Sequence, residues 1–506
     1  MARTLLLATL LLTVAGCARG HNSSEPANPQ KNAVSIVATA AVEKRGDYQR
    51  FHTEKDFSPP AIELDTPPAK GTSPGYIFLT PRAADADRPS GPTILDSQGN
   101  LVWFLPRPGR VSSDLKAQTL GGKRVITWGE RAPVVSPPEI FEADPKDLFF
   151  MVADNNYTPF LRVRAIGKGV GTDMHEFRIT GRGTVLMFGF KIVPRDLTSV
   201  GGVANGQLVD SLVQEIDLKT GKLVFNWSAL EHVPMSDSLF PAPKNENPWE
   251  TYHANSISET SDGNLLVSMR HTSAIYKIDR KTGKVLWTLG GKHSDFEMGP
   301  GTTFYYQHDA QPLGDGKVLL FDNGSSYTDR RHPFSRLKVI RLDGAARTAT
   351  LDQDVIHDKA ILAVSQGNAR RLPNGNYFIG WGNREWFSEY TPEGQELFDA
   401  KVPTVAYQSY RAFKEDWNGQ PKTKPKIVAD RTRGRTLIWV SWNGTTATKT
   451  WKVLGGPTQT TLKPLGVGDR QGFETRLDVA AAPRVVRVQA LDAKGKVLAT
   501  SAAARP

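Results

Sequence analysis

Short apolar runs separated by polar turns dominate the chain after about residue 50. Runs such as GYIFLT (75–80) and KRVITWG (123–129) are rich in β-branched and aromatic residues and are bounded by Gly, Asp, Asn and Pro. Runs of this length and composition are typical of β-strands. Almost no segment shows the 3.6-residue periodicity of an amphipathic helix. The pattern therefore predicts an all-β protein.

These runs recur as pairs of hairpins. An inner hairpin closed by a D-G or N-G turn is followed by an outer hairpin with a turn such as IDxxTGK, and the unit occurs four times between residues 175 and 402. Four strands per unit, repeated every several dozen residues, predict a β-propeller, and hairpins between residues 92 and 170 supply one or two further blades. Each unit opens on a polar residue: His175, His253, His308 and Asn368. Because innermost strands line the central channel of a propeller, we expect these four residues to face one cavity.

The composition shifts at both ends of the repeat region. PKTKPK (421–426) is typical of a linker, and the short alternating runs beyond it predict a fibronectin- or immunoglobulin-like β-sandwich. The Ser-, Asn-, Pro- and Ala-rich stretch before the repeats is typical of a tether. The predicted organisation is a signal peptide (1–16), a flexible tether (17–50), a six-bladed propeller (51–418), a linker (419–427) and a C-terminal sandwich (428–506).

The N-terminus predicts export. Arg3 precedes the apolar run LLLATLLLTV, which is too short for a stable membrane span, and small residues lead to Cys17. The tail VAGC (14–17) is similar to a bacterial lipobox, and Cys17 is the only cysteine in the chain. We therefore expect an exported lipoprotein, periplasmic or at the cell surface, held to a membrane by lipid on Cys17. The alternative is a plain signal peptide cleaved near Ala18.

The net charge of the chain does not point to any additional function. The formal net charge is +11, but the Lys and Arg residues are spread through turns, with no basic arm and no nucleic-acid motif. We therefore expect no nucleic-acid partner. Gly201-Gly202 and Gly290-Gly291 are isolated pairs without the spacing of a phosphate-binding loop, so no nucleotide cofactor is expected.

Five ordered motifs carry a family resemblance. They are H-E-F (175–177), H-x-N-S-I (253–257), S-M-R-H (268–271), Q-H-D-A (307–310) and L-L-F-D-N-G (319–324). From about Phe57 to Asp416 the chain resembles the bacterial and fungal arylsulfotransferases. The resemblance implies a six-bladed propeller that moves a sulfuryl group from aryl sulfates to phenols without phosphosulfate and without a cofactor. It also implies that His308 is the nucleophile, forming a sulfohistidine, and that His253, Arg270 and His175 are its catalytic partners.

The chemistry of these residue types agrees with that assignment. A neutral imidazole is a good nucleophile near pH 7, and a covalent intermediate divides the transfer into two displacements. A guanidinium can bind the sulfuryl oxygens, and further imidazoles can move the phenolic proton. Polar residues at equivalent strand ends complete the expected site as substrate-binding residues: His271, Asn255, Asn323 and Asn368.

Two other interpretations stay open from the sequence. In the first, the histidines are structural, and the propeller is a catalytically silent module that binds a polymer or a protein at the cell surface. In the second, the three histidines ligate a metal in a hydrolase. The sequence leaves the oligomeric state undetermined.

Overall fold

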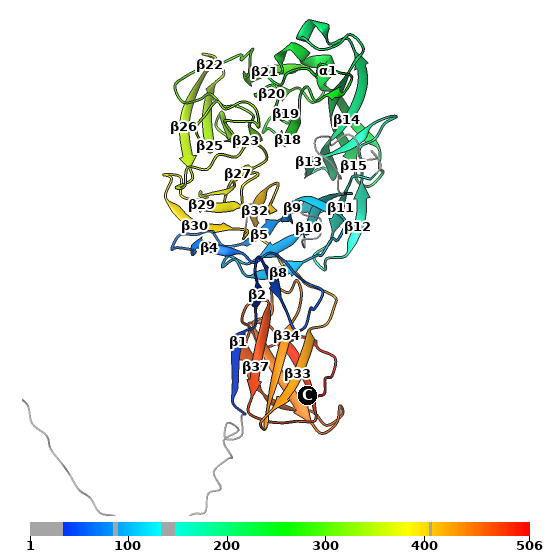
Figure 1. Cartoon of the computed structure of the whole chain (residues 1–506), viewed down its shortest axis with the longest axis vertical. Coiled ribbons are helices and arrows are strands. Elements are labelled where there is room, and N and C mark those ends of the chain that lie inside the picture. The colour runs from blue at the N-terminus through cyan, green and yellow to red at the C-terminus, as the bar shows by residue number, and fades with distance from the viewer. Residues whose placement is uncertain (1–33, 84–89, 133–146, 404–406) are drawn as a thin grey trace, which may run out of the picture.

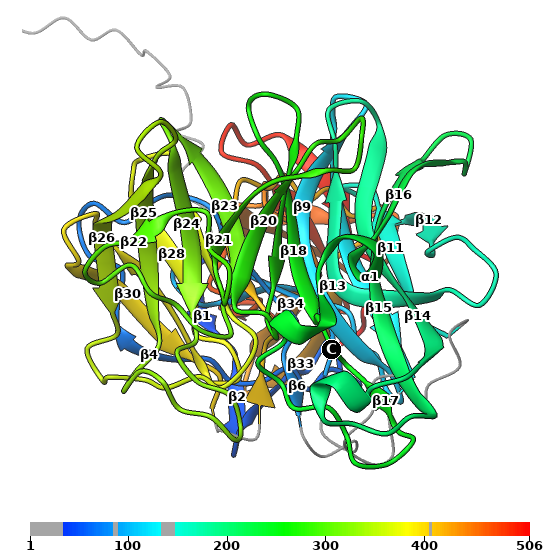
Figure 2. The same cartoon turned by 90° about the horizontal axis from the view of Figure 1, so that it is seen from above.

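The computed structural model of the chain describes residues 34–83, 90–132, 147–403 and 407–506. In these ranges the chain forms a closed ring of six antiparallel sheets and, beside the ring, a two-sheet sandwich (Figure 1). Figure 2 turns this view by 90°, so that the blades are seen from the side. The prediction of an all-β propeller followed by a sandwich is confirmed.

The first three blades follow one another along the chain, except that the innermost strand of blade I comes from the end of the propeller region. Blade I contains β32 (Ala412–Glu415), β5 (Tyr76–Leu79), β7 (Thr93–Leu95) and β8 (Leu101–Phe104). Blade II contains β9 (Val111–Leu120), β10 (Lys123–Arg131), β11 (Phe149–Ala153) and β12 (Pro159–Val163). Blade III contains β13 (Gly171–Ile179), β14 (Thr184–Arg195), β15 (Gly206–Asp217) and β16 (Leu223–Ser228), with β17 (Pro248–Trp249) beside β15.

The last three blades carry the repeats that are clearest in the sequence. Blade IV contains β18 (Ala254–Glu259), β19 (Leu265–Met269), β20 (Ala274–Ile278) and β21 (Val285–Gly290). Blade V contains β23 (His308–Gly314), β24 (Lys317–Asp322), β25 (Arg336–Asp343) and β26 (Thr348–Ile356), with β22 (Glu297–Met298) on its outer edge. Blade VI contains β27 (Asn368–Arg371), β28 (Tyr377–Gly380), β29 (Trp386–Tyr390) and β30 (Glu396–Lys401), with β4 (Glu63–Thr66) outside β30.

Short elements connect these sheets. Two strand pairs lie outside the blades: β2 (Glu43–Arg45) with β3 (Tyr48–Arg50), and β6 (Arg82–Ala83) with β31 (Tyr407–Gln408). The helical segments of the described residues are η1 (Thr198–Val200), α1 (Ala229–His232) and η2 (Met235–Asp237). No helix in the described part of the chain has the length and apolar character needed to cross a membrane.

The repeated turn motif explains the outer hairpins. In the turn after β15, Oδ1 of Asp217 accepts hydrogen bonds from the backbone N–H and the hydroxyl of Thr220, and Gly221 adopts a φ of 69°. Asp279 and Thr282 repeat the same bonds after β20, with Gly283 at a φ of 75°. A side-chain acceptor followed by glycine in the left-handed region closes each turn without strain.

Apolar residues fill the space between neighbouring blades. Each of six clusters of buried side chains joins two adjacent sheets, from blades I and II around to blades VI and I. The cluster between blades III and IV, for example, packs Phe188 and Trp227 against Ile257 and Tyr276. Because every blade is buried on both faces, the strands have nearly continuous apolar runs. The inner strands are thereby held at fixed positions around the channel.

The sandwich corrects the domain boundaries predicted from sequence. Its sheets contain β1 (Ile36–Ala40), β37 (Glu474–Val479), β34 (Arg435–Ser441) and β33 (Lys426–Thr432), and β36 (Lys463–Asp469), β35 (Thr450–Gly456), β38 (Val485–Leu491) and β39 (Val497–Thr500). Strand β1 lies inside the segment expected to be a flexible tether, yet it pairs along its length with β37. The tether expectation therefore fails from residue 36 to residue 50, because the hydrogen-bonding partner of this segment lies at the other end of the chain. The sandwich also begins at Lys426, slightly before the expected residue 428.

The sandwich is fastened to the propeller by buried polar contacts. The amide of Asn443 brackets Phe104 of blade I, accepting from its backbone N–H at 3.0 Å and donating to its carbonyl at 3.0 Å. The hydroxyl of Tyr157 in blade II donates to the carbonyl of Gly444 at 2.7 Å. These contacts fix the sandwich beside blades I and II, away from blades III to V. The signal peptide and Cys17 lie outside the described residues.

Candidate active site

The residues predicted to be catalytic converge at one end of the central channel. His175 lies in β13, His253 immediately precedes β18, and His308 is the first residue of β23, so three adjacent blades each contribute an imidazole. The rings of His175 and His253 lie 4.8 Å apart, and those of His253 and His271 lie 4.7 Å apart. The charge of Arg270, which follows β19, acts on both His253 and His308. Three of the four residues that open the repeats therefore cluster in the structure, whereas the fourth, Asn368, bonds to the backbone of Ala412.

His308 is held in one tautomer. Its Nδ1 lies 2.7 Å from Oδ1 of Asn323 and 3.1 Å from the carbonyl of Tyr306, and both oxygens are acceptors. The amide nitrogen of Asn323 donates to the carbonyls of Ala363 and Gln366, so its oxygen must be the atom facing His308. Nδ1 therefore carries the proton and Nε2 carries the lone pair. The backbone N–H of Gln366 donates to that lone pair at 3.2 Å.

The charge state of His308 suits a nucleophile. Burial and the charge of Arg270 hold the pKa of His308 well below its usual value, and the hydrogen bond to Asn323 offsets this only in part. The imidazole is consequently neutral at pH 7. Its Nε2 lone pair is available once the N–H of Gln366 moves aside.

Arg270 is a buried cation that forms no direct ion pair with the described residues, although the charge of Glu250 acts on it from a longer distance. Its two terminal nitrogens donate to Nε2 of His271 at 2.7 Å and to the carbonyl of Val364 at 2.9 Å, and its Nε has no partner in the described part of the chain. Its guanidinium carbon lies 5.4 Å from the ring centre of Tyr306. Burial lowers the pKa of Arg270, but a guanidinium stays charged at any physiological pH. A buried guanidinium with a free Nε and no direct ion pair in the described part of the chain is suited to bind an anionic group of a ligand.

Asp173 distinguishes His175 from the other imidazoles. Its Oδ1 accepts from Nδ1 of His175 at 2.6 Å and from the backbone N–H of the same residue at 2.8 Å. Burial lowers the pKa of His175, but the charge and hydrogen bond of Asp173 outweigh burial and raise it above its usual value. His175 therefore holds a proton more firmly than its neighbours do.

His253 has the opposite character. Burial, followed by the charges of His175 and Arg270, holds the pKa of His253 well below its usual value. Oε1 of Glu250 lies 2.7 Å from its Nδ1 but out of line for a hydrogen bond. The backbone of His253 adopts a φ of 51°, a strained conformation for a residue with a side chain, and its carbonyl accepts from the N–H of Arg270 at 3.0 Å. The site thus places an imidazole whose pKa is lowered beside one whose pKa is raised.

Two asparagines expected to bind substrate have a different role in the structure. The amide of Asn255 donates to the carbonyl of Gln307 and accepts from the N–H of Asp309, which joins blades IV and V. The amide of Asn368 brackets Ala412 in the same way and joins blades VI and I. Both side chains are fully buried and engaged with backbone. They clamp the inner strands together, and no free atom of either amide faces a ligand.

The other two expected substrate-binding residues form hydrogen bonds with the predicted catalytic residues. Asn323 is fully buried and contacts His308, as described above. The ring of His271 stacks on Phe240 with centroids 4.4 Å apart, and its Nδ1 donates to the carbonyl of Glu250. Its Nε2 receives the hydrogen bond from Arg270. His271 therefore positions the guanidinium.

A buried cluster of charges fills the channel beside the site. Lys116 lies 2.7 Å from Asp114 and 2.5 Å from Glu176, and Arg411 lies 3.1 Å from each of the same two carboxylates. Asp309 lies 3.7 Å from Arg411. These residues come from the inner strands of four blades or the residues next to them, so the cluster spans the channel. Substrate must therefore reach the histidines from the opposite end.

The same geometry disfavours a metal at the histidines. The ligand atoms of Glu250, His253 and His271 lie within 4.8 Å of one another. Nδ1 of His271, however, donates a hydrogen bond to a carbonyl, and its Nε2 already accepts a hydrogen bond from the Arg270 guanidinium. A cation at this point would have to displace one positive group and lie beside another. The spacing of these three residues would allow a metal, but the hydrogen bonds of His271 disfavour the metal-hydrolase alternative.

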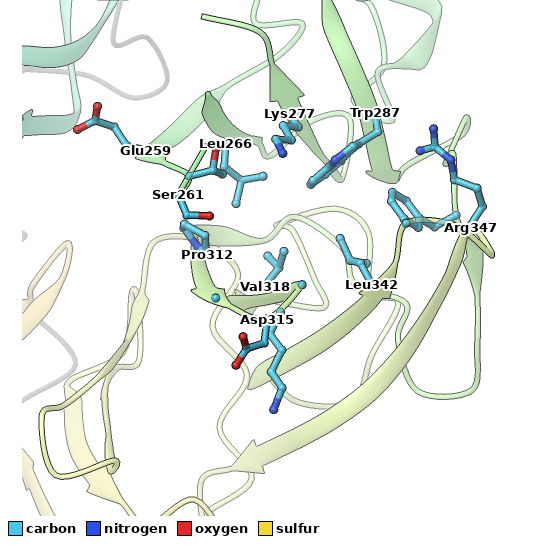
Figure 3. A pocket seen from close by; sticks show the side chains of 16 residues that line it. Glu259, Ser261, Leu266, Lys277, Trp287, Pro312, Asp315, Val318, Leu342 and Arg347 are labelled. Carbon is cyan, nitrogen blue, oxygen red and sulfur yellow. The ribbon is translucent and has the colours of Figure 1, made fainter. Parts of the chain in front are cut away.

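A separate cavity lies away from the histidines. It has a volume of about 530 Å³ and opens between blades IV and V. Figure 3 shows Leu266, Val318 and Leu342 around a common space, with Trp287 and Arg347 at one end. Its lining includes the turn that ends β23, whereas His308 begins that strand. None of the predicted catalytic residues lines this cavity.

Three site residues were missed in the sequence analysis. Asp173 and Glu250 precede His175 and His253 by two and three residues, so a search for carboxylates close to each histidine would have found them. Gln366 carries no such signal. It acts through its backbone N–H, and it meets His308 only because blades V and VI are neighbours in the ring.

Comparison with known proteins identifies the family. Residues 150–402, half of the chain, match the arylsulfotransferase (ASST) family, and this range contains every predicted catalytic residue. The chain belongs to the arylsulfotransferase family. Membership supports a sulfotransferase-type enzyme, and the substrates of arylsulfotransferases are in general aryl sulfates and phenols.

The other comparisons add little to this arylsulfotransferase assignment. No curated protein matches the chain. A solved protein of unknown function from Bacteroides caccae shares 14% identity over 67% of this chain and 98% of its own, with a TM-score of 0.40. A protein from Lactobacillus plantarum shares 13% over 80% and 99%, with a TM-score of 0.33, and a streptogramin B lyase shares 11% over 67% and 97%, with a TM-score of 0.30. At these scores the likenesses carry no argument about mechanism.

Proposed function

We propose that this arylsulfotransferase moves a sulfuryl group from an aryl sulfate to a phenol in two displacements, through a covalent intermediate on Nε2 of His308. One observation carries the proposal. A neutral imidazole with its lone pair oriented by Asn323 lies in the field of a buried guanidinium that forms no direct ion pair with the described residues. A nucleophile beside an anion-binding group is what transfer of a sulfuryl group requires.

In the first displacement, Nε2 of His308 attacks sulfur, and the bond between sulfur and the phenolic oxygen breaks. Arg270 binds the sulfuryl oxygens, and the N–H of Gln366, already 3.2 Å from Nε2, is placed to donate to one of them. His175, whose pKa is raised, donates its proton to the departing phenolate. Nδ1 of His308 keeps its proton, so Asn323 and the carbonyl of Tyr306 stabilise the positive charge on the substituted ring.

The second displacement reverses these roles. The acceptor phenol attacks sulfur, the bond between sulfur and Nε2 breaks, and His308 returns to its neutral form. The phenolic proton passes to His175, directly or through His253, whose ring lies 4.8 Å away and is neutral. Each half-reaction therefore ends with the protonation states that the next one needs.

Trapping the intermediate tests the proposal. The protein is mixed with 4-nitrophenyl sulfate without an acceptor, quenched in base and digested, and the peptides are analysed by mass spectrometry. We expect a stoichiometric release of 4-nitrophenol and one added sulfuryl group on the peptide that contains His308. A folded protein that releases no phenol and carries no sulfuryl group would instead support the catalytically silent propeller.

The contact between Asn323 and His308 predicts a pH effect. In the Asn323→Asp variant a carboxylate faces Nδ1, which raises the pKa of His308. Because only neutral His308 attacks, the acidic limb of the profile of kcat/KM against pH should move to higher pH. Asn323→Ala is the matched control, since both variants lose the hydrogen bonds to Ala363 and Gln366 but only one adds a charge. Identical profiles in the two variants would contradict the assigned contact.

The pairing of Asp173 with His175 predicts a dependence on the leaving group. In Asp173→Asn the pKa of His175 should fall, because the carboxylate that raises it is gone. Less His175 is then protonated, and the alkaline limb of the profile should move to lower pH. Transfer from a donor with a weakly acidic phenol should slow by about 10²-fold, the scale of general acid catalysis. Transfer from 4-nitrophenyl sulfate should change little, and an equal loss with both donors would contradict the assignment of His175 as the acid.

We further propose that the protein is an exported lipoprotein anchored through Cys17, on the strength of the VAGC tail. Since β1 enters the sandwich at Ile36, the sandwich would lie between the anchor and the propeller. Cys17→Ser should move the protein from the membrane fraction to the soluble fraction of fractionated cells. Retention of the variant in the membrane fraction would contradict the anchor.

A further inference from the structure

An exposed tyrosine lies at the mouth of the catalytic site. Tyr327 follows β24 in a tight turn, in which the N–H of Ser326 donates to the carbonyl of Asp329 at 2.7 Å. Its side chain is 75% exposed, more than any other large apolar or aromatic residue in the described ranges. The turn therefore presents the phenol to solvent from a defined backbone position.

Two contacts connect this phenol to the nucleophile. The hydroxyl of Tyr327 lies 3.4 Å from the hydroxyl of Ser365. The next residue, Gln366, donates its N–H to Nε2 of His308 at 3.2 Å. The phenol and the reactive nitrogen thus both contact the short segment formed by Ser365 and Gln366, and a sulfuryl group on Nε2 would lie next to that segment.

The surrounding charges would stabilise a sulfated phenol. The hydroxyl of Tyr327 interacts electrostatically with Arg270 and with Arg82. Arg82 belongs to β6, so the two cations approach the phenol from different parts of the ring. A sulfate ester at this point would carry its negative charge into the field of both guanidinium groups.

We propose that Tyr327 is an internal acceptor, so that the protein sulfates its own tyrosine when no free phenol is present. The inference rests on the proposed function, because it starts from sulfurylated His308. The bond between sulfur and Nε2 breaks, a bond between sulfur and the phenolic oxygen of Tyr327 forms, and the phenolic proton passes to the His175 and His253 pair. His308 returns to its neutral form and reacts with a second donor.

Transfer of the sulfuryl group to Tyr327 is thermodynamically favourable when the donor is an activated aryl sulfate such as 4-nitrophenyl sulfate. Tyrosine is in general a weaker acid than 4-nitrophenol. A sulfate ester of the weaker acid is the more stable one, so the group stays on Tyr327. The modified residue would place a fixed sulfate at the mouth beside Arg270, and it should compete with incoming donor.

The full-length protein tests the inference with 4-nitrophenyl sulfate as the probe and no acceptor. The wild-type chain should release two equivalents of 4-nitrophenol in a burst, one for Tyr327 and one for His308. Tyr327→Phe should release one equivalent, and His308→Ala should release none. Tyr305→Phe is the matched control, because Tyr305 lies in the same region but packs against His332 and Arg331, and it should behave as wild type.

Mass spectrometry and dilution decide between the outcomes. A sulfuryl group on Tyr327, formed at a rate independent of protein concentration, supports internal transfer. A burst of one equivalent with the group on His308 alone overturns the inference and leaves the proposed function standing. Modification of Tyr327 in His308→Ala, or a rate that rises with protein concentration, also overturns it. A chain that releases no phenol and carries no sulfuryl group overturns both proposals.

Discussion

The His308→Ala variant is expected to lose sulfuryl transfer by roughly 10⁵- to 10⁶-fold in kcat, the scale seen when a covalent nucleophile is removed from an enzyme. The loss should be this large because no other imidazole in the site can replace His308 as the nucleophile. None has a free, oriented lone pair at the place where His308 would attack sulfur. The ring of His253 packs against His175, whose pKa is raised, and Nε2 of His271 is occupied by Arg270. The measurement is the steady-state transfer from 4-nitrophenyl sulfate to phenol, together with single-turnover release of 4-nitrophenol.

The control for this variant is His293→Ala, because the side chain of His293 is exposed and lies outside the catalytic cluster. It should retain wild-type activity. Both variants should keep the thermal unfolding profile of the wild type, since His308 contributes one ring at the channel and no inter-blade cluster depends on it. Substantial transfer by a folded His308→Ala protein would rule out the covalent route and leave direct transfer between bound donor and acceptor.

The second large effect is expected for Arg270→Gln. Removing a preorganised donor that meets developing negative charge costs about 3–4 kcal/mol, or roughly 10²- to 10³-fold in kcat. The buried guanidinium forms no direct ion pair with the described residues and its Nε has no hydrogen-bond partner there, so it can bind the sulfuryl oxygens. Arg270→Lys should recover only part of the loss, because an ammonium cannot present the planar pair of donors that a guanidinium presents.

A second measurement separates this role from a structural one. The charge of Arg270 is the largest influence after burial that lowers the pKa of His308. In Arg270→Gln the pKa of His308 should therefore rise, and the acidic limb of kcat/KM should move to higher pH. Arg384→Gln is the matched control, because Arg384 donates to the carbonyl of Leu362 in the loop that also contacts Arg270. A loss of activity without any movement of the acidic limb would contradict the placement of Arg270 beside the nucleophile.

Much of the architecture could be predicted from the sequence because the signals are local. The turn IDxxTGK identified the outer hairpins, and the structure forms it with the same hydrogen bonds at Asp217 and Asp279. The inner strands of the four clear repeats could be placed roughly in phase because a polar residue lies near the start of each one. His308 opens β23 and Asn368 opens β27, whereas His253 precedes β18 and His175 lies inside β13. The end of the tether was wrong, because the short strand β1 resembles a linker in composition until its partner β37 is known.

The candidate site could likewise be predicted only in part from the sequence. The residue types of His175, His253, Arg270 and His308 indicated the chemistry, and their convergence followed from the repeat. The roles of the asparagines could not be predicted, because an amide that clamps two strands and an amide that faces a ligand look alike in sequence. Asn255 joins blades IV and V, whereas Asn323 orients the nucleophile.

The amino-acid sequence by itself determined the all-β repeat, the ring of blades and the set of chemical groups, since alternation and turn chemistry act over a few residues. Only the tertiary structure decided which imidazole holds a proton and which nitrogen carries the lone pair. Those properties depend on burial and on partners such as Asp173, Asn323 and Arg270, and closure of the ring brings these groups together from separate blades. Charge and tautomer are therefore set by three-dimensional surroundings that no local pattern records.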